Sequence, residues 1–287
     1  MRFRRAWGVL FLLPLLLGVL AACDPATPAA PEPGCKVLIL EQTVTGGVDS
    51  IEAQEAIASG CTVELVNDAG WAAKTQAEFA AYQAIILGDP TCGSPGVADF
   101  YLGAPAANTA TWSPAVTGNI VIIGTDPVFH SFQGGEALTR RGVDFTVDNP
   151  GETGLYITLS CYYHDTAPNT PVPALNGFGT FTVKGVGCFN DAHITATHPA
   201  LAGLTDDDLS NWSCSVHEAF DGYPSAFQVL AIAENAGTEY TAPDGTVGTP
   251  YILARGERVV ARCLTARGRQ FFRWPDGSCR PDPPPAA

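Results

Sequence analysis

The chain has 287 residues, which is enough to bury a hydrophobic core without help from a metal or a disulfide. Hydrophobic residues make up 46% of the chain and charged residues 15%, a balance that excludes a disordered polyelectrolyte. The net charge of −14 at pH 7 would repel a phosphate backbone, so we expect no nucleic-acid partner.

The first 22 residues are typical of an export signal. Arg2, Arg4 and Arg5 precede an uncharged apolar stretch over residues 6–20, and small residues follow it. The stretch is shorter than the roughly 20 residues that a membrane-spanning helix needs. We therefore predict a cleaved signal peptide over residues 1–22.

Residues 20–23, Leu-Ala-Ala-Cys, resemble the lipobox of bacterial lipoproteins. The resemblance implies that Cys23 is the first mature residue and carries a lipid, which makes the membrane a partner. Residues 23–34 are rich in Pro and Ala and predict an extended tether. The alternative is an ordinary secretory signal cleaved after Ala22. We predict a membrane-anchored, exported protein, at the periplasmic face or the cell surface.

The cysteine count indicates an oxidising compartment. If Cys23 carries lipid, eight cysteines remain, an even number that predicts four disulfides. They are Cys35, Cys61, Cys92, Cys161, Cys188, Cys214, Cys263 and Cys279. We expect Cys35 to pair with Cys61, because both stand at the starts of predicted parallel strands. Cys263 and Cys279 would close a local loop, and the pairing of the other four stays open.

Apolar strands alternate with helices through the first half of the chain, as in a parallel sheet covered on both faces. The strands are expected at 36–41, 62–66, 84–89, 119–126 and 154–163, and the helices at 48–59, 75–83 and 135–145. Further strands are expected at 180–183, 227–234, 249–256 and 258–264. This order predicts an α/β fold, a flavodoxin-like or doubly wound, mostly parallel sheet with antiparallel C-terminal additions.

The predicted α/β body is one domain over residues 35–279, followed by a disordered tail over 280–287. Two helical faces can be assigned from spacing: Val48, Ile51 and Ala58 share one, and Phe79 and Tyr82 share another. No G-x-G-x-x-G fingerprint follows the first strand and no P-loop occurs, so we expect no nucleotide cofactor.

Polar residues gather where the predicted strands end, and ligands bind at that edge of a parallel sheet. The candidate ligand-binding residues are Asp89, Asp126, His130, His217 and Glu218. The alternative for Asp89 and Asp126 is ordinary turn chemistry, in which the side chain caps its own backbone.

A metal site is a second alternative at the same place. Asp126, His130, His217 and Glu218 form a workable ligand set, but they lack H-x-x-x-H or H-E-x-x-H spacing, so we predict no metal. The absence of C-x-x-C also argues against a structural zinc site or a thioredoxin-like pair.

Several segments together resemble the class I glutamine amidotransferase-like superfamily, particularly its ThuA-like branch. They are KVLIL, AIILGD, NIVIIGTDPVFH, HPALAGLTDDDLSNWSCSVHEAF and FQVLAIAE. The resemblance implies the same α/β fold, and catalytic members carry a nucleophilic Cys in a G-x-C-x-G elbow with a downstream His and Glu. It also implies an association with carbohydrates, on which Tyr162, Tyr163 and Trp212 could stack.

The catalytic pattern of that superfamily is not reproduced. The candidate nucleophiles, Cys92 and Cys161, lack the flanking glycines of the elbow, and His217 and Glu218 are adjacent instead of separated by one residue. A free catalytic thiol would also leave another cysteine unpaired. We therefore predict non-catalytic binding of a carbohydrate or other small polar ligand. The alternatives are a Cys-His-Glu or metal-assisted hydrolase and a purely structural envelope protein.

Overall fold

The computed structural model describes residues 34–90, 92 and 97–256, together with the backbone of three later strands. The predicted signal peptide, Cys23, nearly all of the tether and residues 281–287 lie outside this part. Contacts along the chain separate residues 1–33 from a compact unit over 34–287. Within the described residues, no helix is both long and apolar enough to cross a membrane.

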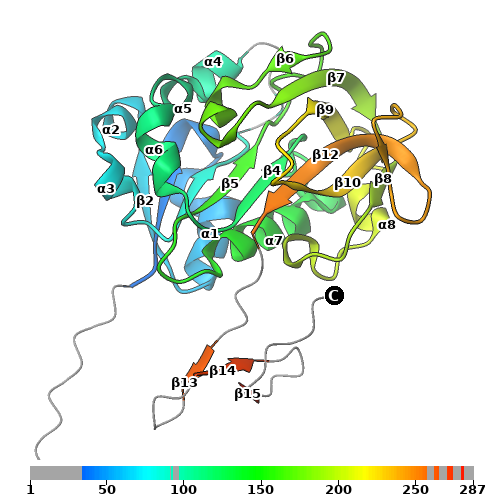
Figure 1. The fold of residues 1–287 in the computed structure, drawn as a ribbon. Coiled ribbons are helices and arrows are strands. Elements are labelled where there is room, and N and C mark those ends of the chain that lie inside the picture. Colours follow the sequence, from blue (N-terminus) through cyan, green and yellow to red (C-terminus); the bar gives the residue numbers. More distant parts are fainter. Residues whose placement is uncertain are drawn as a thin grey trace, which may run out of the picture. The chain divides into compact units, whose positions relative to one another are not determined.

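A large sheet forms the centre of the fold, and its first half is parallel (Figure 1). The strand order in this half is β2-β1-β3-β5-β4. The strands are β1 (Lys36–Leu40), β2 (Thr62–Val66), β3 (Ala84–Leu87), β4 (Ile120–Ile123) and β5 (Gly154–Thr158). All five were expected from the sequence, but the position of β5 between β3 and β4 was not.

The second half of the sheet is antiparallel and continues from β4 in the order β12-β10-β8, with β11 paired to β12. These strands are β8 (Ala192–Ile194), β10 (Gln228–Glu234), β11 (Tyr240–Thr241) and β12 (Val247–Arg255). The structure thus confirms the predicted fold class, a doubly wound α/β sheet with antiparallel C-terminal additions.

Side chains that alternate along the strands divide the hydrophobic core into two layers. Leu38 and Leu40 of β1 belong to one layer, whereas Val37 and Ile39 belong to the other. Helices cover both faces, as Figure 1 shows. They are α1 (Ile51–Ala58), α2 (Asp68–Ala73), α3 (Gln76–Phe79), α4 (Ala98–Tyr101), α5 (Gly103–Ala107), α6 (Thr109–Trp112), α7 (Gly135–Val147) and α8 (Asp206–Leu209).

Helix α7 packs closely on β5 because Gly142 has no side chain. A Cβ there would lie 2.6 Å from the ring of Tyr156, a distance that real Cβ atoms do not adopt. The helix therefore runs almost directly over the centre of the sheet.

The predicted face of α1 is wrong. Val48 is 49% exposed, and the buried residues of the helix are Glu52, Ala53 and Ala56. The reason is that the helix begins only after its N-cap, Ser50, so residues 47–49 form a separate 3-10 turn with a different phase. The helix predicted over 75–83 is shorter than expected: α3 ends at Phe79, so Tyr82 lies outside it, although both side chains are buried.

A second, smaller sheet has the order β6-β7-β9 and is antiparallel. Its strands are β6 (Thr170–Pro171), β7 (Thr182–Phe189) and β9 (Val216–Gly222). The sequence did not predict a strand over β9. His217 and Glu218 lie within it, and β9 pairs with β7 along the register that matches Gly185 with Glu218.

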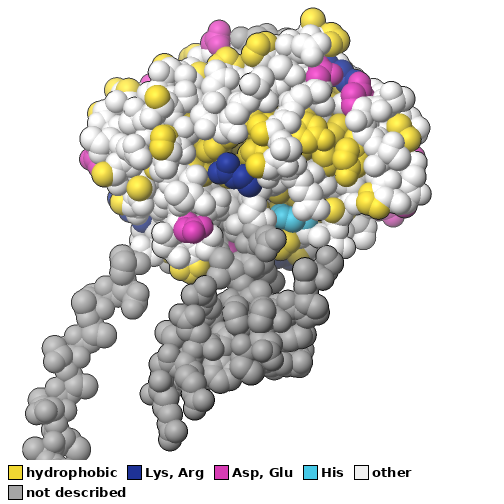
Figure 2. Space-filling model, in the orientation of Figure 1, with side chains coloured by type: hydrophobic (Ala, Val, Ile, Leu, Met, Phe, Trp, Pro, Cys, Tyr) yellow, Lys and Arg dark blue, Asp and Glu magenta, His cyan; other side chains and the backbone are white. Residues whose placement is uncertain are grey.

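The last strands form a sheet of their own, β13 (Arg262–Leu264), β14 (Gln270–Arg273) and β15 (Cys279–Arg280). The side chains of Cys263 and Cys279 lie outside the described part, so their predicted disulfide stays a prediction. On the face of the molecule in Figure 2, acidic and basic side chains adjoin at the upper right, and hydrophobic side chains gather across the middle.

Candidate functional site

The neighbouring strands β3, β5 and β4 bring three chain segments to one edge of the sheet. Leu87 of β3 is in register with Ile157 of β5, and Ile123 of β4 with Thr158. The residues that follow these strands therefore emerge side by side at their carboxyl ends. This places Asp89 and Asp126 on either side of the segment that leaves β5.

Strand β9 reaches the same edge through the backbone of Gly124. The amides of His217 and Glu218 donate to the Gly124 carbonyl, at 3.3 and 3.2 Å. A Cβ at position 124 would lie 2.4 Å from the carbonyl oxygen of Glu218. Only glycine permits this approach, so Gly124 is what brings His217 and Glu218 to Asp126.

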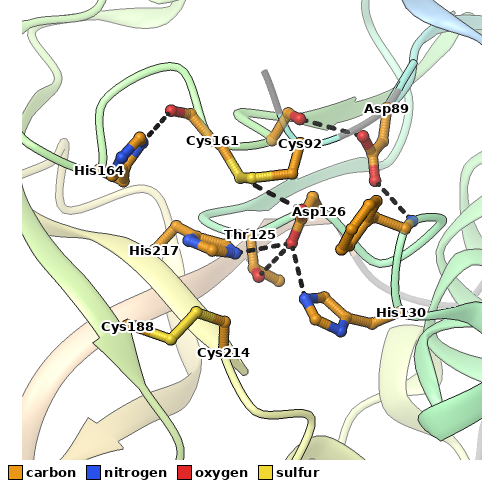
Figure 3. Close-up of a disulfide and its surroundings, with 12 residues drawn as sticks. Asp89, Cys92, Thr125, Asp126, His130, Cys161, His164, Cys188, Cys214 and His217 are labelled. Atoms are coloured by element: carbon orange, nitrogen blue, oxygen red, sulfur yellow. Dashed lines mark hydrogen bonds and ion pairs between the residues drawn. A yellow bond between two sulfur atoms is a disulfide. The ribbon is translucent and has the colours of Figure 1, made fainter. Parts of the chain in front are cut away.

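Asp126 is at the centre of the site, and its side chain is fully buried. The Nε2 atom of His217 lies 2.9 Å from Asp126 Oδ1, and the Nε2 atom of His130 lies 3.5 Å from the same oxygen (Figure 3). His130 Nδ1 lies 2.8 Å from the side-chain oxygen of Gln133, which fixes its ring. Two imidazoles from separate elements thus converge on one carboxylate.

Asp89 holds the loop that follows β4. Its Oδ2 atom accepts from the amides of Val128 and Phe129, at 3.0 and 3.4 Å, and its Oδ1 atom accepts from the hydroxyl of Ser160 at 3.0 Å. Burial, with the carboxylates of Asp126 and Glu52 nearby, raises the pKa of Asp89 well above its usual value. These contacts differ from the turn alternative, because the amides that Asp89 caps belong to the connection after β4 and not to its own turn.

Glu218 is the third buried carboxyl group predicted from the sequence. Neither of its oxygens makes a hydrogen bond of normal geometry within the described residues. Burial raises the pKa of Glu218 well above its usual value, and the carboxylates of Asp126 and Asp89 add to the shift. All five predicted ligand-binding residues are therefore placed at one edge of the sheet.

Glu52 is a site residue that the sequence reasoning missed. It is fully buried, and its Oε1 atom accepts from the amide of Asp89 at 3.2 Å. Burial raises its pKa to about 7. A Cβ at Gly88 would lie 2.3 Å from Glu52 Oε1. The glycine directly after β3 was the available signal, because it marks a close approach at a strand end.

Ser160 was also missed. It is fully buried and has a φ of 50°, in the left-handed region that is unfavourable for a residue with a Cβ. Such strain is retained where the surrounding contacts over-determine the backbone, and it often accompanies function. Here it turns the chain sharply at the end of β5, directly before Cys161.

Three disulfides lie within the described residues. Cys35 pairs with Cys61 as predicted, with a Cα–Cα distance of 4.4 Å at the starts of β1 and β2. The pairs that the sequence left open are Cys92–Cys161 and Cys188–Cys214. The two candidate nucleophiles are thus bonded to each other, so neither is present as the thiolate that a cysteine hydrolase needs.

The aromatic residues predicted to stack on a sugar are not available to a ligand. Tyr162 and Trp212 are fully buried, and Tyr163 is 6% exposed. The exposed rings near this edge include those of Phe129, 51% exposed, and Phe132, 84% exposed. Both lie in the loop after β4, on either side of His130.

Comparison with known proteins finds no matching family model and no matching curated protein. Among solved structures, the fold is similar to a protein from Thermoplasma acidophilum described as a GMP synthase component, at 10% identity and a TM-score of 0.35. The match covers 70% of this chain and 73% of the other. The ThuA-like resemblance stays a prediction.

Proposed function

We propose that the protein is an exported lipoprotein, anchored through Cys23, that binds a carbohydrate or similar small polar ligand at the carboxyl edge of its large sheet. The sequence of residues 1–23 supports the anchor. The three disulfides of the described residues are compatible with export, because such bonds persist in oxidising compartments.

The observation that carries the binding proposal is the loop over residues 127–134. Phe129 and Phe132 expose 51% and 84% of their surface there, although exposing large apolar side chains to water is unfavourable. The loop is held rigidly beneath them, since Asp89 accepts from two of its amides and His130 contacts both Asp126 and Gln133. Rigid exposed aromatic rings are suited to stacking on the apolar face of a sugar.

The lack of basic partners beneath the loop sets a preference for the ligand. Within the described residues, none of the buried carboxyl groups of Asp89, Asp126 and Glu218 forms an ion pair with a lysine or an arginine. The cluster therefore offers no lysine or arginine to a sugar acid, whereas its carboxyl oxygens accept hydrogen bonds from hydroxyl and amino groups. We therefore propose a neutral or amino sugar in preference to a sugar acid.

The binding proposal is tested by thermal unfolding of the oxidised protein with neutral, amino and acidic sugars. A ligand at a hundredfold excess over its Kd stabilises the folded state by about 2.7 kcal/mol. We expect neutral or amino sugars to raise the Tm and sugar acids to have no effect.

The matched variants are Phe129→Ala with Phe132→Ala, and Ile57→Ala as the control. Ile57 is also an exposed hydrophobic residue, 45% exposed, but it lies in the last turn of α1. The double variant is expected to lose the Tm shift and the control to keep it. A shift that survives in the double variant, or no shift with any sugar, contradicts the proposal.

The anchor is tested separately by membrane fractionation and intact mass. We expect the wild type to sediment with membranes and to carry a lipid mass on Cys23. Cys23→Ser should be released or remain unprocessed. A soluble wild type without added mass contradicts lipid anchoring and leaves the binding proposal untouched.

A further inference from the structure

The carboxyl edge also brings four metal-ligating side chains together. The Sγ atoms of Cys92 and Cys161, a carboxylate oxygen of Asp126 and a ring nitrogen of His217 all lie within 4.8 Å of one another. They come from the ends of three different strands and from within β9. Two sulfurs, one nitrogen and one oxygen form a donor set typical of zinc, and the ligands of a tetrahedral zinc ion are about 3.3–3.8 Å apart.

The side chain of Asp126 accepts a hydrogen bond from the Thr125 hydroxyl, at a long 3.4 Å, and its remaining contacts are poorly satisfied while Cys92 and Cys161 are bonded. Cys161 Sγ lies 3.2 Å from Asp126 Oδ2, but a disulfide sulfur has no proton to donate. His217 Nε2, on a side chain 5% exposed, lies 2.9 Å from Asp126 Oδ1 yet makes no hydrogen bond of normal geometry. The four ligand atoms already face one another, and a cation bound between them would satisfy them together.

The neighbouring His130 is oriented by a side-chain contact, as metal-ligating histidines are. His130 Nδ1 lies 2.8 Å from Gln133 Oε1, an acceptor of the kind to which a metal-ligating histidine donates through its second ring nitrogen, and Nε2 faces Asp126. Like His217 Nε2, it makes no hydrogen bond of normal geometry. His130 therefore places a second ring nitrogen, besides that of His217, beside the carboxylate of Asp126.

We propose that reduction of the Cys92–Cys161 disulfide converts this edge into a binding site for a zinc-class divalent cation, ligated by Cys92, Cys161, Asp126 and His217. A dithiol reductant transfers two electrons and two protons to the disulfide, forming two thiols and its own disulfide. The cation then binds both thiolates and releases the two thiol protons. Once the sulfur–sulfur bond is broken, the two sulfurs move apart to the separation that a tetrahedral site requires.

The Cys188–Cys214 disulfide is the natural contrast. It joins β7 to the segment before β9, and Figure 3 shows it below the Asp126 cluster. Neither of its cysteines belongs to a group of metal-ligating side chains within the described residues. Its reduction should therefore create no comparable site.

The test uses Co²⁺ as a spectroscopic probe for Zn²⁺ and a phosphine as the reductant. The phosphine and one water reduce each disulfide to two thiols and yield a phosphine oxide. We expect the oxidised protein to give no thiolate-to-cobalt charge-transfer band. The reduced protein should bind one Co²⁺ with that band and with the intense visible bands of tetrahedral cobalt, and Zn²⁺ should displace it.

Variants assign the ligands. Cys92→Ser with Cys161→Ser should abolish the band, whereas Cys188→Ser with Cys214→Ser should retain it. Asp126→Asn and His217→Gln should each weaken Zn²⁺ binding by at least about 10–100-fold in competition with a chromophoric chelator. Circular dichroism of each variant separates loss of a ligand from loss of the fold.

Two results would overturn the proposal: no cobalt–thiolate band in the folded, reduced wild type, or a band that persists in the Cys92 and Cys161 double variant. The proposal is independent of the sugar site, because the sugar titration uses oxidised, metal-free protein. Either proposal can therefore fail while the other stands.

Discussion

The two edges of the parallel sheet differ in how their acidic side chains are placed. One edge carries them in ion pairs near the surface, and the other buries them. On the strands next to the Cys35–Cys61 disulfide, Glu64 forms ion pairs with Lys36 and Lys74, and its pKa is lowered to about 2. At the carboxyl edge, burial raises the pKa of Glu52 to about 7. In the first arrangement each charge has an opposite partner, whereas in the second several carboxyl groups are buried together without a basic partner among the described residues.

This difference indicates what each edge contributes. Ion pairs at the surface and a disulfide between the starts of two strands stabilise the fold. Because these charges already have partners, a ligand would satisfy no unpaired group there. Buried carboxyl groups without basic partners cost stability, and such groups are concentrated at functional sites. The comparison therefore ascribes stability to one edge and supports the binding proposal at the other.

The largest expected effect comes from removing the disulfides. They close loops with sequence separations of 26 for Cys35–Cys61 and 69 for Cys92–Cys161. Chain entropy alone predicts losses of about 3.5 and about 4.4 kcal/mol in the free energy of unfolding. We expect Cys35→Ser with Cys61→Ser to lose about the full value. Cys92→Ser with Cys161→Ser should lose less than its value, because two hydroxyl donors would then lie beside Asp126.

Urea unfolding of the two double variants measures these losses. If the carboxyl-edge variant loses its full entropic value or more, the contacts of Asp126 are already satisfied in the wild type. The polar groups of the carboxyl edge would then be as well satisfied as those of the opposite edge, which contradicts the proposed contrast.

Glu52→Gln should stabilise the protein at high pH. The folded-state pKa of about 7 lies above the usual 4.5, so the folded protein binds the proton more tightly than the unfolded chain. Wild-type stability is therefore unaffected below about pH 4.5, falls as the pH rises from there to 7, and stays reduced above it. The variant should be more stable by up to about 3 kcal/mol at pH 8 and by almost nothing at pH 4. Urea unfolding at several pH values checks this, and a pH-independent difference would contradict it.

Glu64→Gln should have the opposite sign and a smaller size. The folded-state pKa of about 2 lies below the usual 4.5, so the ion pairs contribute stability above pH 4.5. That contribution is lost as the pH falls through the folded value. Because the Glu64 side chain is 32% exposed and screened by water, we expect a loss of about 1 kcal/mol at pH 7. The same titration at high salt should reduce the loss, and an unchanged loss would mean that packing and not charge is responsible.

Phe132→Ala should have the smallest effect on stability. The ring is 84% exposed, so its removal should change the free energy of unfolding by less than about 0.5 kcal/mol. Chemical unfolding measures this directly. A larger loss would show that Phe132 supports the loop, and its role in ligand binding would then have to be tested with Phe129→Ala alone.

Much of the candidate site could be predicted because it depends on local patterns. Asp89 and Asp126 follow apolar strands, and the ends of neighbouring parallel strands meet at one edge whatever the rest of the chain does. Glu52 escaped prediction because a glutamate in the first turn of a helix is normally solvated. Its burial depends on Gly88, which is 36 residues further along the chain and leaves room for its carboxyl group.

The sequence by itself determined the alternation of strands and helices, the doubly wound class of the sheet and the Cys35–Cys61 pair. These follow from hydrophobic period and from the short distance between adjacent parallel strands. Only the tertiary structure decided that β5 lies between β3 and β4, that Cys92 pairs with Cys161, and that β9 crosses Gly124. Those contacts join segments far apart in the chain, and the physical reason is packing: which segments meet depends on how all the layers fit together.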